Sequence, residues 1–221
     1  MINLMYVVLM AMLALNVSTE VLDGFSIVEE SLRRTTANST KENRSRDDGF
    51  EAEMKSNPEK VRAWFAKATE VKTMSDSLYD FVQQLKVAIV KEADGAGGNI
   101  DNIKRKDDLE AASQVMLAPG TGKGKALYNM INSFRNRILS MITDEHQRSV
   151  ISSNLTTELP KNAVTMGKNW QEYMFEDMPV AAAVTLLSKL QSDIRYAEGE
   201  VLHTLVSNID MKDIRVNKLS A

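Results

Sequence analysis

The chain has 221 residues, which is enough to bury a sizeable core in one large domain or two small ones. Its net charge of −3 gives no basic excess, so the composition offers no support for a nucleic-acid partner. The sequence contains no cysteine, which excludes disulfides, thiolate zinc sites and cysteine nucleophiles. With only four prolines, and with no run that alternates as a half-buried strand does, it predicts an all-α fold.

The opening stretch, MINLMYVVLMAMLALNVSTEVLDGF, carries no charged side chain before Glu20. A helix over residues 1–19 would be about 28 Å long, close to the ~30 Å hydrocarbon thickness of a bilayer. A signal peptide would need a basic leader and a small-residue cleavage site, and a buried helix would normally show a polar face. We therefore expect residues 1–22 to form a transmembrane helix. The acidic flank that follows places the bulk of the chain outside the cytoplasm.

Three polar side chains interrupt this apolar segment. Asn3 and Tyr6 lie one helical turn apart on one face, and Asn16 lies to the side of that face. A polar group in hydrocarbon costs free energy unless it meets protein or water. These residues therefore predict a face directed at a membrane partner, with anchoring near one leaflet as the alternative.

Residues 23–210 show helical periodicity in several long segments. The first helix is expected to continue beyond the membrane towards Ser39, and TTANSTKENRSRDDGF then predicts a solvated helix end and a loop. Asn57 as N-cap and Pro58 at the first helical position predict the start of the next helix. Its apolar stripe extends from Val61 to Ile89 with spacings of three and four residues.

Three more helices are expected, over residues 106–117, over residues 123–153 and at the C-terminal end of the chain. Residues 211–221 resemble the start of a linker. Together these segments predict an up-and-down bundle. The apolar stripe of the last helix is longer than one bundle layer needs, so it predicts either core packing or a dimer contact by Leu187, Leu190, Ile194, Val201 and Leu205.

The sequence contains no pattern typical of a catalytic, cofactor or metal site. GTGKGKA is one residue too short for a phosphate-binding loop, lacks the Ser or Thr that binds magnesium, and predicts only a glycine-rich helix start. His146 lies among charged residues and is expected in solvent, and His203 points away from the apolar stripe and is expected in solvent or facing a partner. We therefore expect a protein that is not an enzyme and has no cofactor.

The opening stretch and the segment NWQEYMFEDMPVAAAVTLLSKLQSDIRYAEGEVL closely resemble the GldM/PorM family of the Bacteroidota, and the similarity extends over the whole chain. Members of this family are periplasm-spanning inner-membrane subunits of the motor for gliding motility and type IX protein secretion. They have one transmembrane helix, a helical periplasmic domain and β-rich domains beyond it. The resemblance implies a single-pass inner-membrane protein with residues 23–210 in the periplasm and β domains following residues 211–221.

The resemblance also implies partners. These are a second copy of the chain, a ring of the two-helix membrane protein GldL/PorL driven by the proton motive force, and downstream periplasmic or outer-membrane secretion components. The alternative is a single-span periplasmic sensor or adaptor without a motor role. A sensor would need a cytoplasmic output domain, whereas a motor subunit would have a basic leader before Met1 and further domains after Ala221.

Overall fold

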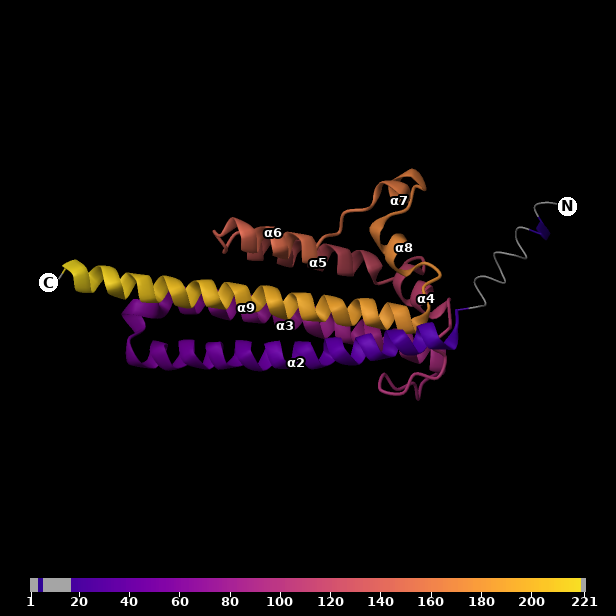
Figure 1. The fold of residues 1–221 in the computed structure, drawn as a ribbon, viewed down its shortest axis with the longest axis horizontal. Helices are drawn as coiled ribbons and strands as arrows, with labels where there is room; N and C mark the ends of the chain where they lie inside the picture. The colour runs from indigo at the N-terminus through magenta and orange to yellow at the C-terminus, as the bar shows by residue number, and fades with distance from the viewer. Residues whose placement is uncertain (1–3, 6–16, 220–221) are drawn as a thin grey trace.

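The computed structural model describes residues 4–5 and 17–219, with side chains described up to residue 210. Three long helices lie side by side along the long axis of the molecule (Figure 1): α2 (Thr19–Ser56), α3 (Pro58–Asp94) and α9 (Val180–Leu219). α2 and α9 run in the same direction, and α3 runs in the opposite one. α2 therefore begins at one end of the bundle, and α9 ends at the other.

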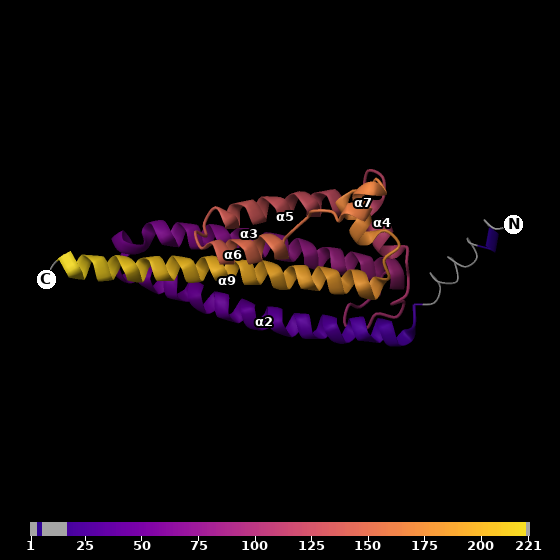
Figure 2. The ribbon, with the colours of Figure 1, turned by 45° about the horizontal axis from the view of Figure 1, so that its top comes forward.

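Shorter helices cover one side of this three-helix unit: α4 (Ala111–Leu117), α5 (Gly124–Leu139), α6 (Glu145–Asn154), α7 (Lys161–Thr165) and α8 (Trp170–Phe175). α5 and α6 form an antiparallel pair along the long helices, and α4, α7 and α8 lie near the end where α2 begins (Figures 1 and 2). Residues 17–219 contain no strand, only an isolated bridge between Asn99 and Asn102. The predicted all-α fold is confirmed.

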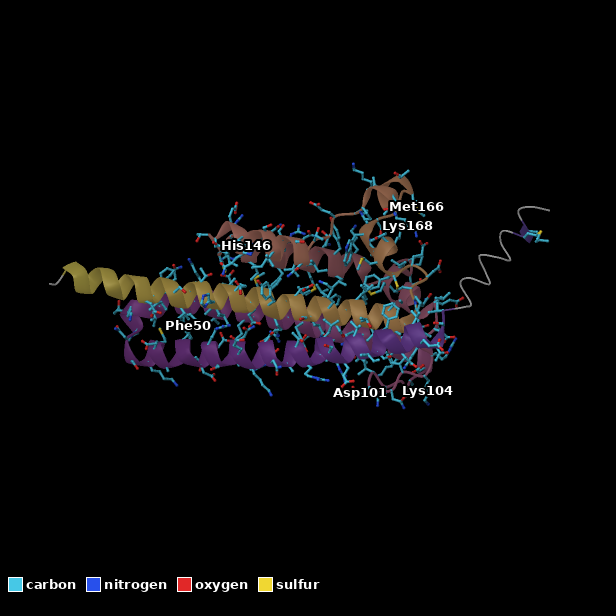
Figure 3. All side chains as sticks on the ribbon, in the orientation of Figure 1. Phe50, Asp101, Lys104, His146, Met166 and Lys168 are labelled. Atoms are coloured by element: carbon cyan, nitrogen blue, oxygen red, sulfur yellow. The ribbon has the colours of Figure 1, made fainter. Side chains whose placement is uncertain are left out.

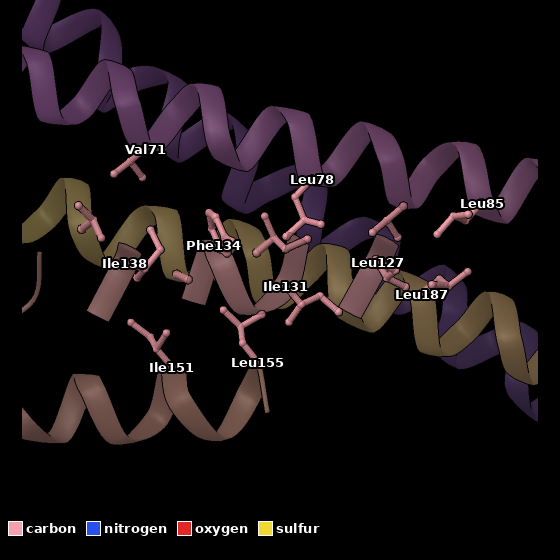
Figure 4. Close-up of a cluster of buried hydrophobic side chains, with 14 of the residues drawn as sticks. Val71, Leu78, Leu85, Leu127, Ile131, Phe134, Ile138, Ile151, Leu155 and Leu187 are labelled. Carbon is pink, nitrogen blue, oxygen red and sulfur yellow. The ribbon is translucent and has the colours of Figure 1, made fainter. Parts of the chain in front are cut away.

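The hydrophobic core lies between the short helices and the long ones. In Figure 4, Ile131 and Phe134 of α5 lie between Leu78 and Val71 of α3 on one side and α6 on the other. Each of these four side chains is at most 2% exposed. Spacings of three and four residues place one whole face of α5 in this core, formed by Leu127, Ile131, Phe134 and Ile138.

The predicted start of α3 is confirmed. Pro58 is its first residue, where the missing N–H of proline costs nothing. Asn57 precedes it, but its side chain makes no capping hydrogen bond; instead its backbone N–H donates to Glu53 O at 2.8 Å. At the other end, Gly95 has a φ of +85° that favours glycine and terminates the helix. The predicted stripe is buried at Val61, Ala68, Val71, Leu78, Val82, Leu85 and Ile89.

The predicted loop between the first two long helices is wrong. α2 continues through the whole of TTANSTKENRSRDDGF and ends at Ser56, and Gly24 lies within it. Thr36, Asn43, Asp47 and Phe50 of this stretch are buried against the bundle. Three of these four buried residues are polar. The segment therefore packs against the bundle without the apolar periodicity by which a buried helix is recognised in a sequence.

The single helix expected over residues 123–153 is also wrong, because it is divided into α5 and α6. After Leu139 the chain turns, and the carboxylate of Asp144 accepts a hydrogen bond from the backbone N–H of Gln147 at 2.8 Å. This N-cap starts α6, which folds back along α5. The helix expected from residue 106 begins only at Ala111, where Asp108 Oδ1 accepts from the N–H of Ala111 at 3.0 Å.

The two ends of the chain differ from their expected arrangement. Val17 and Ser18 are not helical, and Ser18 is the N-cap of α2, so the opening segment and α2 do not form one continuous helix. Within residues 4–5 and 17–219, no helix is long and apolar enough to cross a membrane. Most of the proposed span, residues 1–3 and 6–16, lies outside the described residues. The segment expected to begin a linker continues α9 to Leu219.

Ile131→Ala tests the core position of α5. We expect the free energy of unfolding to fall by about 3 kcal/mol, because the substitution leaves a cavity among side chains that cannot fully collapse into it. Val164→Ala, at an exposed position of α7, serves as the control and should change little. Chemical denaturation measures both variants, and equal stabilities would contradict the arrangement of the core.

Candidate functional site

Charged side chains are buried where α2, α3 and α9 meet. Lys86 is 1% exposed, Arg195 4% and Glu198 2%. A buried charge is costly unless it is paired and hydrogen-bonded, so each of these groups requires a partner on a neighbouring helix. We call these side chains and their partners the polar spine. It has three layers: the lysine layer (Glu29, Lys86, Ser188, Gln191), the arginine layer (Asn43, Ser75, Asp76, Arg195, Glu198) and the aspartate layer (Asp47, Lys72).

The lysine layer joins all three long helices through one ammonium group. Lys86 Nζ of α3 donates to Glu29 Oε1 of α2 and to Gln191 Oε1 of α9, both at 3.2 Å. Ser188 Oγ also donates to Glu29 Oε1, at 2.8 Å, and Gln191 Nε2 donates to Tyr79 O at 3.3 Å. Burial lowers the pKa of Lys86, and the carboxylate of Glu29 opposes that shift. The charged form of the lysine therefore depends on Glu29.

In the arginine layer, one guanidinium group meets two carboxylates. Arg195 Nη1 lies 2.7 Å from Asp76 Oδ1 of α3 and 2.9 Å from Glu198 Oε2 of its own helix. Ser75 Oγ accepts from Arg195 Nη1 at 2.9 Å and donates to Glu198 Oε2 at 2.7 Å. The guanidinium carbon lies 4.4 Å from the ring centroid of Tyr79. Burial opposes the charge, but the two carboxylates outweigh it and raise the pKa of Arg195.

α2 joins the arginine layer where a glycine allows it to approach α9. Asn43 Nδ2 donates to the backbone carbonyl of Arg195 at 2.8 Å. A Cβ added at Gly199 would lie 2.7 Å from Asn43 Oδ1, closer than van der Waals contact allows. Gly199 therefore fixes the separation of α2 and α9 at this level.

The aspartate layer is the least well paired. Asp47 of α2 is 5% exposed, and its Oδ2 is buried without a hydrogen bond. The nearest cation is Lys72 of α3, whose Nζ lies 3.7 Å from that oxygen. Burial raises the pKa of Asp47 to about 6, against the attraction of Lys72.

Residues 95–110 connect α3 to α4, and we call this connection the strap. Ion pairs join it to the first half of α2. Arg33 forms an ion pair with Asp101, and Lys106 Nζ lies 3.1 Å from Asp23 Oδ1. Figure 3 shows Asp101 on the strap beside α2. These pairs are partly exposed, so each contributes less to stability than a buried pair of equal geometry.

The strap also closes the first turn of α9. The N–H of Val180 donates to Asp108 O at 3.1 Å, and the N–H of Ala181 donates to Lys106 O at 3.0 Å. The first N–H groups of a helix have no partner within the helix. The strap satisfies two of them in α9 while Lys106 also holds α2.

Sequence reasoning missed the polar spine, although a signal was present. Inward positions of α2 recur every seven residues at Leu22, Glu29, Thr36, Asn43 and Phe50; four of them are buried, and the side chain of Glu29 is 13% exposed. A seven-residue repeat is typical of helices that pack along their whole length. A search restricted to apolar residues does not find it, because its middle members are polar.

The predicted polar residues of the membrane segment lie outside the described residues. Asn3, Tyr6 and Asn16 all fall in residues 1–3 or 6–16, and their partner-facing role stays a prediction. Among the side chains of residues 4–5 and 17–210, no three histidines or carboxylates gather as a metal site would require.

The predicted stripe of the last helix lies within the bundle of this chain. Leu187, Ile194, Val201 and Leu205 are each at most 2% exposed. Leu190 is only partly buried and lines an apolar groove of about 570 Å³. Whether any of these side chains also contacts a second copy stays a prediction.

GTGKGKA leads into a helix, and the two histidines are exposed, as the sequence predicts. α5 begins at Gly124, where an added Cβ would lie 2.8 Å from Met116 O, so the glycine serves close packing. His146 and His203 are exposed, and Figure 3 shows His146, at the start of α6, far from Met166 and Lys168.

A sequence model of the GldM N-terminal domain matches residues 20–208, most of the chain. The chain belongs to the GldM family. This family consists of components of the gliding motility and type IX secretion machinery rather than of enzymes. The resemblance expected over the whole chain is thus confirmed for the helical bundle, and the match does not include residues 1–19. No curated relative matches this GldM-family chain.

Lys86→Met tests whether the lysine layer stabilises the GldM-family bundle. We expect the free energy of unfolding to fall by about 3 kcal/mol, because the largely buried Glu29 loses its nearest cation and keeps only Arg33, whose Nε lies 3.5 Å away, while Gln191 Oε1 loses its donor. Arg62→Met is the control, since it breaks a single exposed contact with Glu59 within α3 and should change stability little. Equal melting temperatures of the two variants would contradict the importance of the layer.

Gly199→Ala tests the close approach of α2 and α9. We expect a loss of about 2 kcal/mol, because the new methyl group must displace Asn43. Gly49→Ala is the matched control, since Gly49 lies in α2 with no atom near its added Cβ; it should gain up to about 1 kcal/mol in helix stability. Combining Gly199→Ala with Asn43→Ala should cost less than the sum of the two single changes. Additive losses would show that Asn43 does not set the separation.

Proposed function

We propose that the chain is the inner-membrane motor subunit that transmits motion driven by the proton motive force across the periplasm, for type IX secretion and gliding motility. The match to the GldM N-terminal domain over residues 20–208 carries this proposal. The bundle geometry supports it, because α2 begins at one end and α9 ends at the other. Motion applied at the start of α2 is thereby delivered to the opposite end of the domain.

The polar spine supplies the stiffness that such a role needs. Its layers hold α2, α3 and α9 to one another through side chains that lose their partners when a helix slides or rotates. A helix pair held by apolar contacts alone can repack in a new register at lower cost. The spine therefore favours rigid transmission over internal rearrangement.

The proposed location is the bacterial inner membrane, with the opening segment that precedes α2 as a single span and the bundle, which includes Leu22, in the periplasm. The proposed partners are a second copy of the chain, a ring of a two-helix membrane protein of the GldL/PorL type, and secretion components further towards the outer membrane. The charge-free length of the opening segment and its acidic exit flank support the span.

A strain lacking the gene tests the function directly. Loss of type IX secretion and of surface gliding, with recovery from a plasmid copy, is the expected result. Normal secretion and gliding in the deletion strain would overturn the proposal.

The double variant Asn3→Leu with Tyr6→Phe, produced in that strain, tests the coupling face. We expect impaired secretion or gliding while the membrane complex still assembles, because the partner ring loses two polar contacts in hydrocarbon. Leu15→Ile, on the opposite face, is the control and should restore both activities. Full motility of the double variant would rule out a coupling role for these residues, and the deletion result would still decide the function of the chain.

A further inference from the structure

The arginine and aspartate layers together contain more carboxylates than cations. Asp47, Asp76 and Glu198 provide three negative charges, and Arg195 and Lys72 provide two positive ones. Arg195 binds both Asp76 and Glu198 through its Nη1, which lies within 2.9 Å of each. Asp47 is left with Lys72 alone.

The position of Asp47 makes this imbalance costly. Its Oδ2 is buried and accepts no hydrogen bond, and Lys72 Nζ at 3.7 Å is too far away to donate one. Lys72 itself is one-third exposed, with a side-chain exposure of 34%, so solvent weakens its attraction. The cost of burying the carboxylate therefore outweighs the attraction of Lys72, and Asp47 binds a proton more readily than it would in water.

All three helices contribute charges that act on Asp47. Lys72 and Asp76 face it from α3, and Glu198 faces it from α9. On α2 itself, Glu51 and Asp47 line one small cavity, and Asp48 is exposed. Of these groups, Lys72 favours the ionised form, whereas Glu198 and Asp76 disfavour it, as burial does.

We propose that Asp47 is a proton-binding site that makes the packing of the α2–α3 hairpin depend on pH. The protonated carboxyl removes the excess negative charge from the layer and remains buried against α3. The ionised carboxylate requires water, and the adjacent cavity of about 150 Å³, lined by Phe50, Phe65 and Lys72, is where water reaches it. The inference rests on the contacts of the three helices and does not depend on the proposed function.

The direction of the pH effect follows from the pKa of Asp47. Burial raises it to about 6 in the folded chain, above its ordinary value of 3.8. The folded state therefore holds this proton more tightly than the unfolded state does. The contribution of Asp47 to stability is fully present below pH 3.8 and is lost as the pH rises through about 6.

Thermal unfolding of the full chain in mild detergent, between pH 4.5 and 8, tests the proposal with Asp47→Asn. The amide has the shape of the protonated carboxyl and does not ionise. We expect the variant to melt about 5 °C above the wild type at pH 7.5, and the difference to shrink towards pH 4.5. Asp48→Asn, one residue away and exposed, should differ from the wild type by a constant amount across the range.

Two further measurements keep the site identifiable. Lys72→Met removes the described cation that favours the ionised form, so the midpoint of the transition should move to a higher pH than in the wild type. For backbone hydrogen exchange in residues 43–56, the ratio of the wild-type rate to the Asp47→Asn rate should rise above pH 6. The ratio of the wild-type rate to the Asp48→Asn rate should not change with pH. A melting difference independent of pH, or a midpoint that Lys72→Met leaves unchanged or lowers, would overturn the proposal.

Discussion

The guanidinium of Arg195 and its partner Glu198 are buried, and moving α9 by one turn along α3 would take Arg195 away from its second partner, the partly exposed Asp76. The desolvation of charge therefore sets the register of the long helices. Lys86 imposes the same condition further along, because its ammonium group must meet both Glu29 and Gln191. Hydrophobic contacts supply most of the burial, and these polar contacts select one alignment among those that burial alone would permit.

The rest of the fold follows from that alignment. With α2 held at Asn43 and Glu29, its outer face remains in solvent, and its inner face needs no continuous apolar stripe. The apolar contacts are made mainly by α3, whose other side packs on α4 and α5. The strap joins the start of α9 to α2. The same connection accepts hydrogen bonds from the first N–H groups of α9.

Much of this arrangement could be predicted from the sequence where burial is apolar. Val61 to Ile89 and Leu187 to Leu205 have helical spacing, and both segments are buried helices. Apolar spacing does not identify a helix whose buried residues are polar, and the segment that contains Thr36, Asn43 and Asp47 has the composition of a solvated loop. Apolar spacing also failed at Asp144, because it continues through Met141 and Ile142 across the turn. The N-cap pattern of Asp144 followed by Gln147 was the signal that could have located that break. Burial of Lys86 and Arg195 depends on partners from distant segments, which spacing within one helix does not reveal.

The parallel arrangement of α2 and α9 has a mechanical consequence. A pull between the start of α2 and the end of α9 is directed along both helices. Such a load shears the two helices past each other, so every contact along their common length resists at once. Had the two ends emerged at the same end of the bundle, the same pull would peel the helices apart one contact at a time. The bundle is thus built to resist tension along its axis, and its weakest direction is sideways.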